Sequence, residues 1–195
     1  MKKKPKIVIV EGAQGGGKTT LTNILRDMMP YSNLMRLSGI KDKSEEARPK
    51  VVNIYYSLMQ MLYSMKGTEM SWIFDRTFFS ERVYCMLGYK DYDFKEDYDY
   101  FLMSLAKLSE YYDIYLFVLV ADEKTYEDRL NRDKPQFGAV KFGAENSMRQ
   151  QEAYLELMKE INRNYPRDIQ AYLIQTVNRD PYDIAYDIIE GMRMT

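Results

Sequence analysis

The sequence predicts an α/β fold built around a parallel β-sheet. Short apolar runs alternate with amphipathic stretches along the 195 residues, a pattern typical of strands that are each followed by a helix. Two runs, 6–10 and 114–120, are apolar at nearly every position, as strands buried on both faces are. A glycine-rich segment follows the first run directly and precedes a helical pattern. The length suits one domain, 1–195, with a substantial core.

Boundary signals and periodicity place the remaining elements. Strands are expected at 6–10, 33–37, 71–75, 114–120 and 169–174, and helices at 18–29, 44–65, 79–87, 98–111, 122–132, 145–164 and 181–192. Pro30 ends the first helix, because the residue before a proline disfavours helical geometry. Gly67 and Gly88 lie just past two other helices, where glycine often terminates a helix. The tyrosine-rich, acidic segment 89–100 is expected to cap a helix and cover a surface.

Composition excludes several kinds of site and partner. Histidine is absent, which removes Ser–His triads and ordinary zinc sites. The single cysteine, Cys85, excludes an intramolecular disulfide. The formal net charge is −1, so no stable nucleic acid partner is expected. No apolar run approaches the ~18 residues of a membrane span and no signal peptide is recognisable, so we expect a cytoplasmic protein with no membrane partner.

Residues 12–19 (GAQGGGKT) match the phosphate-binding pattern G-x-x-x-x-G-K-[ST] at every position. Glycines let backbone N–H groups point at a phosphate, and the N-terminus of the following helix adds partial positive charge. We expect Lys18 to reach the β- and γ-phosphate oxygens of ATP and the Thr19 hydroxyl to bind Mg²⁺. The expected ATP- and phosphate-binding residues are Gly12, Gln14, Gly15, Gly16, Gly17, Lys18, Thr19 and Thr20.

Asp75 and Arg76 directly follow the apolar residues of the predicted strand 71–75. Motor and switch ATPases usually carry a pair of carboxylates at such a position, and the guanine-binding pattern N-K-x-D of GTPases is absent. A lone acid followed by arginine suits transfer between two anionic groups: Asp75 would hold Mg²⁺ through its water shell, and Arg76 would neutralise phosphate oxygens. We therefore expect a phosphotransferase with ATP as co-substrate and Mg²⁺ as cofactor.

These residues resemble the thymidylate kinase and deoxynucleoside kinase superfamily of P-loop kinases. Residues 9–12 (IVEG) resemble its P-loop entry, and Asp75-Arg76-Thr77 with Ser80 and Tyr84 resembles the thymidylate kinase D-R-Y motif and its downstream serine and tyrosine. The resemblance implies a three-layer P-loop fold, with a five-stranded parallel sheet in the order 2-3-1-4-5 and helices on both faces. It also implies a role in nucleotide biosynthesis and often a homodimer.

The resemblance extends to a lid over ATP. Arg129 and Arg132, with the polar loop 133–143, resemble the arginine-bearing lid of these kinases, and both arginines are expected to stabilise charge during transfer. One position departs from the pattern, because Gln14 stands where thymidylate kinases carry an acidic residue. The sugar contact made by that acid is therefore not expected in the same form.

The acceptor site is predicted from scattered residues. Arg36 and Arg76 are expected to hold an acceptor phosphate. On the helix 44–65, Tyr56 and Gln60 are expected to recognise the base, since an amide beside an aromatic face can bind a base edge. The segment 75–82 (DRTFFSER) also resembles the E-R-S segment of deoxynucleoside kinases, in which Glu81 would lie by the base.

The expected reaction is phosphorylation of a nucleoside monophosphate, with a deoxynucleoside kinase as the alternative. A nucleoside hydroxyl needs a general base, yet the first acid after the strand 33–37 is Asp42, in a loop. A monophosphate is already ionised and needs cations such as Arg36 and Arg76. A polynucleotide 5′-kinase and a non-catalytic P-loop nucleotide-binding module remain further alternatives.

Overall fold

A five-stranded sheet forms the centre of the computed structural model, which describes residues 4–132 and 143–194. All strand pairs are parallel, and the order is β2-β3-β1-β4-β5. The strands are β1 (Lys6–Gly12), β2 (Ser32–Arg36), β3 (Ser71–Asp75), β4 (Asp113–Val120) and β5 (Gln170–Gln175). The predicted fold class and strand order are confirmed.

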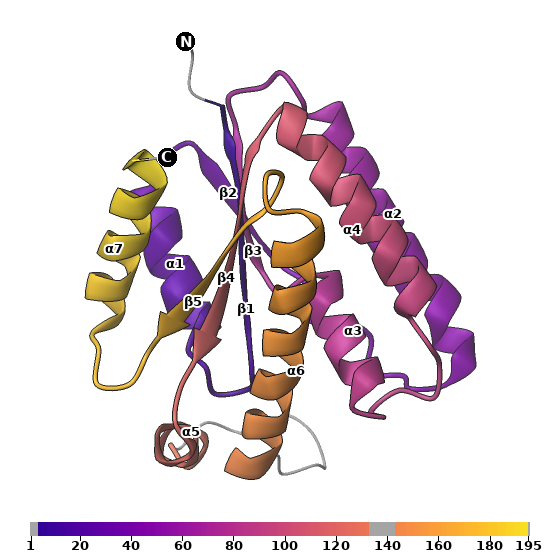
Figure 1. The fold of residues 1–195 in the computed structure, drawn as a ribbon, viewed down its shortest axis with the longest axis vertical. Coiled ribbons are helices and arrows are strands. Elements are labelled where there is room, and N and C mark those ends of the chain that lie inside the picture. Colours follow the sequence, from indigo (N-terminus) through magenta and orange to yellow (C-terminus); the bar gives the residue numbers. More distant parts are fainter. Residues whose placement is uncertain (1–3, 133–142, 195) are drawn as a thin grey trace.

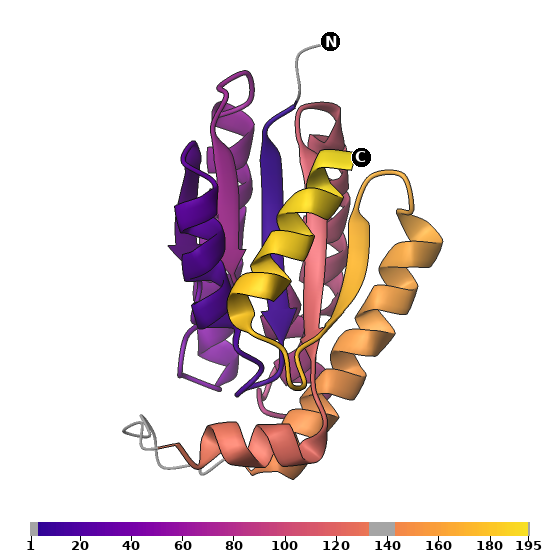
Figure 2. The same cartoon turned by 90° about the vertical axis from the view of Figure 1, so that its left-hand side faces the viewer.

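Helices cover both faces of the sheet (Figure 1). One face carries α1 (Lys18–Met28) and α7 (Pro181–Met194), and the other carries α2 (Arg48–Ser64), α3 (Phe78–Met86), α4 (Lys95–Lys107) and α6 (Ala144–Asn164). The short helix α5 (Glu123–Leu130) lies across the end of the sheet to which the strands point (Figure 2). The molecule therefore has three layers, with α5 at the carboxyl edge of the sheet.

The apolar runs of the central strands fill two cores. Successive side chains of a strand point to opposite faces: Val8 and Val10 pack with α1 and α7, whereas Ile7 and Ile9 pack with the helices of the other face. All four side chains are at most 1% exposed. Burial on both sides explains why this strand is apolar throughout.

Two sequence expectations differ from the structure. The helix expected over 44–65 begins as a 3₁₀ turn, Glu45–Ala47, and α2 itself starts at Arg48 with Pro49 in its first turn. Proline is tolerated there because the N–H of a first-turn residue has no partner within the helix. The segment 89–100 is not only a surface covering, because Phe94 and Tyr98 are fully buried. The centroid of the Tyr98 ring lies 5.9 Å from that of Phe78, so this tyrosine packs in the aromatic core although its sequence neighbours are acidic.

The strand order opens a crevice beside β1. The connection from β1 leads to β2 on one side of it, and the connection from β3 leads to β4 on the other side. Ligands of such sheets bind at the carboxyl ends of the strands where the direction of the connections reverses. Val10 lies beside Asp75 of β3 and Phe117 of β4. Among the described residues, no helix is long and apolar enough to cross a bilayer.

Candidate active site

The glycine-rich loop joins β1 to α1 at the crevice. Gly12, at the end of β1, has φ of 141°, and a Cβ placed there would lie 2.7 Å from the carbonyl oxygen of Leu119. Gly17 has φ of 91° and caps the N-terminus of α1. Only glycine tolerates such a left-handed conformation and such close approach of two strands without strain, so the spacing of the motif is set by backbone geometry.

Lys18 is folded back onto its own loop. Its side chain is 5% exposed, and Nζ donates to the carbonyl oxygens of Gly12, at 2.8 Å, and Ala13, at 2.7 Å. Burial, and secondarily the nearby Arg76 guanidinium, place the pKa of Lys18 well below its ordinary value. An entering phosphate would supply the missing negative charge for this ammonium group.

Thr19 and Asp75 meet at the start of α1. The Thr19 hydroxyl donates to Asp75 Oδ2 at 2.7 Å, and Asp75 is 5% exposed at the end of β3. Arg36 Nε, from the end of β2, lies 3.8 Å from the same oxygen. Magnesium is commonly held by one or two protein oxygens together with phosphate oxygens and water. The hydroxyl and carboxylate of this pair fit such a role.

Arg76 directly follows β3 in a strained conformation. Its φ is 73°, an uncommon value outside glycine that persists where surrounding contacts impose it. The guanidinium Nη1 donates to Ser80 Oγ at 3.2 Å and Tyr84 Oη at 3.0 Å, both on α3. The side chain borders the same cavity as Asp75.

A buried carboxylate holds the backbone next to Arg76. Glu11 is 0% exposed and accepts hydrogen bonds from Thr77 N at 2.6 Å, Ser80 Oγ at 2.7 Å and Tyr154 Oη at 3.1 Å. Burial raises its pKa above the ordinary value, and the Ser80 bond opposes that shift. Glu11 thus joins β1 to α3 and α6, with its oxygens already occupied by protein donors.

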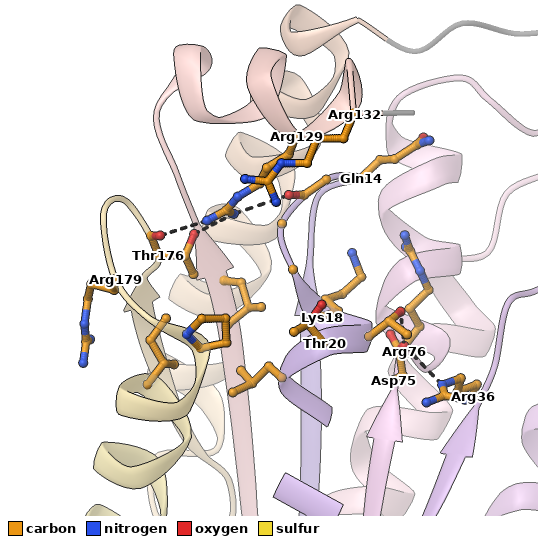
Figure 3. Close-up of a pocket in the computed structure, with 18 of the residues that line it drawn as sticks. Gln14, Lys18, Thr20, Arg36, Asp75, Arg76, Arg129, Arg132, Thr176 and Arg179 are labelled. Carbon is orange, nitrogen blue, oxygen red and sulfur yellow. Dashed lines mark hydrogen bonds and ion pairs between the residues drawn. The ribbon is translucent and has the colours of Figure 1, made fainter. Parts of the chain in front are cut away.

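One cavity of about 530 Å³ lies between the glycine-rich loop and the residues at the carboxyl ends of β2 and β3. Figure 3 shows Lys18 and Thr20 from α1, Arg36 from β2, Asp75 from the end of β3 and Arg76 directly after it facing this cavity. Among the described residues that line it, six are cationic and one is a carboxylate; the cations are Lys18, Arg36, Arg76, Arg129, Arg132 and Arg179, and the carboxylate is Asp75. Such an excess of positive charge suits a polyanionic ligand.

Arg129, on α5, and Arg132, two residues beyond its end, line the cavity from one side. Asp122 begins this helix by accepting a hydrogen bond from Thr125 N at 2.8 Å. Arg129 donates to the carbonyl oxygen of Thr176 at 2.9 Å and to its hydroxyl at 3.0 Å. Arg132 is exposed and lines the cavity. The predicted lid, 133–143, lies outside the described residues except for Gly143 at its end, and Arg132 directly precedes it.

The structure gathers most, but not all, of the predicted site residues. Gln14, Gly15, Gly16, Gly17, Lys18, Thr19, Thr20, Arg36, Asp75, Arg76, Arg129 and Arg132 line the cavity. Gly12 lies beneath it, where its carbonyl oxygen accepts from Lys18. The carboxylate and the phosphate-binding motif therefore lie together, although 56 positions separate Thr19 from Asp75.

The three predicted base-binding residues do not line this cavity. Tyr56 is 46% exposed and Gln60 is exposed, whereas the inward face of α2 carries Tyr55 and Met59. The helical period places residues 56 and 60 together, but on the solvent side. Glu81 is 2% exposed, lies 3.3 Å from Lys90 Nζ and accepts from the Tyr92 hydroxyl.

Sequence reasoning missed four contributors. Thr176 and Arg179, after β5, line the cavity, and Ser147 and Gln150 of α6 bond the glycine-rich loop. Ser147 and Gln150 are three positions apart, so they lie on the same face of the helix. Two polar residues on a face that is otherwise apolar were the one sequence feature that could have indicated their role. No local pattern marks Thr176, since its role depends on where β5 ends.

The fold and the cavity together define a P-loop α/β protein of the nucleoside and nucleotide kinase type of architecture. No family model and no curated protein matches the sequence. Solved structures do match. The YorR protein of Bacillus subtilis, in complex with phosphorylated GDP, aligns with a TM-score of 0.66 and 19% identity over 97% of this chain and 96% of that one.

Two further solved structures show the same architecture. Deoxyadenosine kinase from M. mycoides, with dCMP and dCDP bound, aligns with a TM-score of 0.62 and 16% identity over 97% of this chain and 100% of that one. Thymidylate kinase from Candida albicans aligns with a TM-score of 0.59 and 14% identity, over 100% and 93% of the two chains. The chain thus has the fold of these kinases, as the resemblance predicted.

Proposed function

We propose that the protein transfers the γ-phosphoryl group of ATP, with Mg²⁺, to a (deoxy)nucleoside monophosphate and releases the diphosphate. The observation that carries this proposal is the charge of the cavity, in which six cationic side chains and one carboxylate line the space beside the P-loop. Two phosphorylated substrates bring more negative charge than a single nucleotide does. Cations at both ends of the cavity match that need.

The P-loop end is proposed to hold ATP. Its backbone N–H groups and the N-terminus of α1 would bind the β-phosphate, and Lys18 would turn from the carbonyl oxygens of Gly12 and Ala13 to the phosphate oxygens. Arg129 and Arg132 would stabilise the charge that develops during transfer. A bound Mg²⁺ would neutralise phosphate charge, with Thr19 and Asp75 as its protein-side partners.

The ends of β2 and β3 are proposed to hold the acceptor. Arg36 and Arg76 lie on either side of Asp75 and can bind an acceptor phosphate while it approaches the transferred group. Asp75 is the one carboxylate among the described lining residues, and Thr19 and Arg36 already engage it. Glu11 accepts several protein hydrogen bonds and does not line the cavity.

These contacts favour a monophosphate acceptor over a nucleoside. A nucleoside hydroxyl needs a free carboxylate as general base, whereas a monophosphate is already ionised and needs cations. A nucleoside would leave Arg36 and Arg76 without the phosphate contacts that a monophosphate supplies, so a site of this charge discriminates against it. We therefore propose a nucleoside monophosphate as acceptor, and the resemblance to thymidylate kinases makes a pyrimidine deoxynucleoside monophosphate such as dTMP the first candidate.

A substrate panel tests the proposal. ATP consumption and product formation are measured with every common nucleoside and nucleoside monophosphate, with Lys18→Ala as the inactive control. The expected result is phosphorylation of one or a few monophosphates. Turnover of nucleosides alone would support a deoxynucleoside kinase, turnover of a DNA 5′ end a polynucleotide kinase, and phosphate release without an acceptor a nucleotide-binding ATPase module.

We also propose a homodimer formed through α2 and α4. Their outer faces carry large exposed apolar side chains, namely Ile54, Tyr56, Tyr100 and Met103, each 41–46% exposed. Pairing with a second copy would remove this surface from water. Light scattering after size-exclusion chromatography should give twice the mass of 23.2 kDa, and Tyr56→Glu should give the monomer.

A further inference from the structure

Two buried side chains of α6 hold the P-loop at a single residue. Ser147 Oγ donates to the carbonyl oxygen of Gln14 at 2.9 Å, and Gln14 N–H donates to Gln150 Oε1 at 3.1 Å. Ser147 is 0% and Gln150 1% exposed. Both backbone groups of Gln14 are therefore bound from one helix, which lies 133 and 136 positions further along the chain.

The neighbouring carbonyl groups of the loop are also bound. Lys18 Nζ contacts the carbonyl oxygens of Gly12 and Ala13, and Gly16 N–H donates to that of Ala13 at 3.1 Å. Carbonyl oxygens that faced the cavity would repel a phosphate. Because protein donors bind these carbonyl oxygens, loop N–H groups other than those of Gln14 and Gly16 can face the phosphate.

Peptide planarity gives the Ser147 bond a specific consequence. In a trans peptide the C=O of one residue and the N–H of the next point in opposite directions. Since the Gln14 carbonyl is turned toward Ser147 on α6, the Gly15 N–H is turned away from α6. Gly15 lines the cavity and has φ of 78°.

This peptide needs such a restraint. Glycine populates positive and negative φ about equally, so rotation of the plane between Gln14 and Gly15 meets little steric resistance from Gly15. A rotated plane would present the Gln14 carbonyl in place of the Gly15 N–H. Burying the Ser147 hydroxyl and the Gln150 amide costs free energy unless each is hydrogen-bonded. Both side chains therefore favour the loop conformation in which the backbone of Gln14 bonds to them.

We propose that Ser147, assisted by Gln150, is a positioning residue that fixes the Gln14–Gly15 peptide so that the Gly15 N–H faces the phosphate of the bound nucleotide. The proposal rests on the phosphate-binding role given above to the loop. Neither side chain touches substrate in this arrangement. Their effect passes through the orientation of one backbone donor.

The carbonyl contact can be observed directly without any ligand. Gln14–Gly15 is the one Gln–Gly pair in the sequence, so ¹³C-carbonyl glutamine with ¹⁵N-glycine gives a single doubly labelled peptide in an NMR experiment. Ser147→Ala should shift the Gln14 carbonyl resonance upfield, as loss of a hydrogen bond does, and the exposed Glu152→Gln on the same helix should not. An unchanged resonance in Ser147→Ala would overturn the clamp.

Nucleotide binding then tests the consequence. In wild type and Glu152→Gln, ADP should move the Gly15 amide resonance strongly downfield, because a charged acceptor polarises the N–H. In Ser147→Ala that shift should be lost and ADP affinity should fall about tenfold, the scale of one hydrogen bond to a charged group. Adenosine, which has no phosphate, should bind equally to all three proteins.

The outcomes separate this inference from the proposed function. Equal loss of ADP and adenosine binding, or a folded Ser147→Ala that binds ADP like wild type, would overturn the positioning role. Gln150→Met removes the other contact with little change in side-chain volume. Like Ser147→Ala, it should weaken ADP binding and leave adenosine binding unchanged. A wild-type protein that binds no ADP would instead contradict the proposed function, while the free-protein carbonyl resonance would still decide whether the clamp exists.

Discussion

The two ends of the cavity are built in different ways. At the P-loop end, backbone groups of consecutive residues are held by Lys18, Ser147 and Gln150, all at most 5% exposed. At the other end the charges come from side chains of separate strands, and the Arg36 side chain is 49% exposed. The donor end therefore depends on buried contacts to the loop backbone, two of which come from α6, whereas the acceptor end depends on long side chains at the ends of separate strands.

This difference predicts a steep order of mutational effects. Backbone donors and a buried lysine have no substitutes nearby, so changes at the P-loop end should remove activity. The half-exposed Arg36 can be partly replaced by water, so its loss should alter acceptor affinity more than the maximal rate.

Lys18→Ala should have the largest effect. The variant should keep its fold but should lose at least about 3 kcal/mol of transition-state stabilisation, roughly a hundredfold in rate. Circular dichroism and turnover measured on the same sample check this. Near-normal turnover would contradict the assignment of the loop.

Asp75→Asn should come next. The amide keeps an oxygen near Thr19 but loses the charge that attracts Mg²⁺, so kcat should fall about ten- to a hundredfold and the Mg²⁺ concentration for half-maximal rate should rise. Acceptor KM should change much less. A magnesium titration at saturating substrates measures both, and unchanged metal dependence would show that β3 does not border the metal.

Arg76→Ala and Arg36→Ala compare the two acceptor cations. Arg76 is fixed by Ser80 and Tyr84, so its loss should lower kcat and raise acceptor KM, together by about 2 kcal/mol in kcat/KM. Arg36 is half exposed, so its loss should raise acceptor KM about three- to tenfold with a smaller change in kcat. Steady-state kinetics with varied acceptor separate these parameters, and equal effects on ATP KM would assign the arginines to the donor end.

Tyr56→Ala and Gln60→Ala should have the smallest effect on acceptor kinetics. Both side chains lie on the outer face of α2, away from the cavity, so acceptor KM should stay within about twofold of wild type. A large, base-dependent rise in KM for either variant would support the prediction that they recognise the base. All kinetics should be recorded at the same protein concentration, above the dissociation constant of the proposed dimer, because Tyr56 lies in the proposed dimer surface.

The sequence predicts the sheet and the P-loop well because both depend on local patterns. Alternation of apolar runs and helical patterns indicates the α/β class, and the resemblance to P-loop kinases implies the strand order and the layers. The glycines at 12–17 carry the loop geometry within a few residues of Lys18. Asp75 was found because it stands directly after a strand that borders β1. In each case one strand end determines the position of the side chain.

The acceptor side was less predictable because it depends on which face of a helix turns inward. Tyr55 and Tyr56 are adjacent in sequence, yet one is buried and bonded to the Thr77 carbonyl while the other is exposed. Glu81 was expected near a base, and the structure pairs it with Lys90 from the following loop. Such pairings join segments whose relative placement no local pattern specifies.

The most direct test of the account compares one acceptor with and without its phosphate. The ratio of kcat/KM for dTMP to that for thymidine, measured with Mg²⁺ and ATP, asks whether the cavity between Arg36 and Arg76 was built for a dianion. The account predicts a ratio far above one, about a hundredfold or more, since thymidine lacks the phosphate that Arg36 and Arg76 would bind. A ratio below one, with thymidine or deoxycytidine turned over faster than any monophosphate, would contradict it.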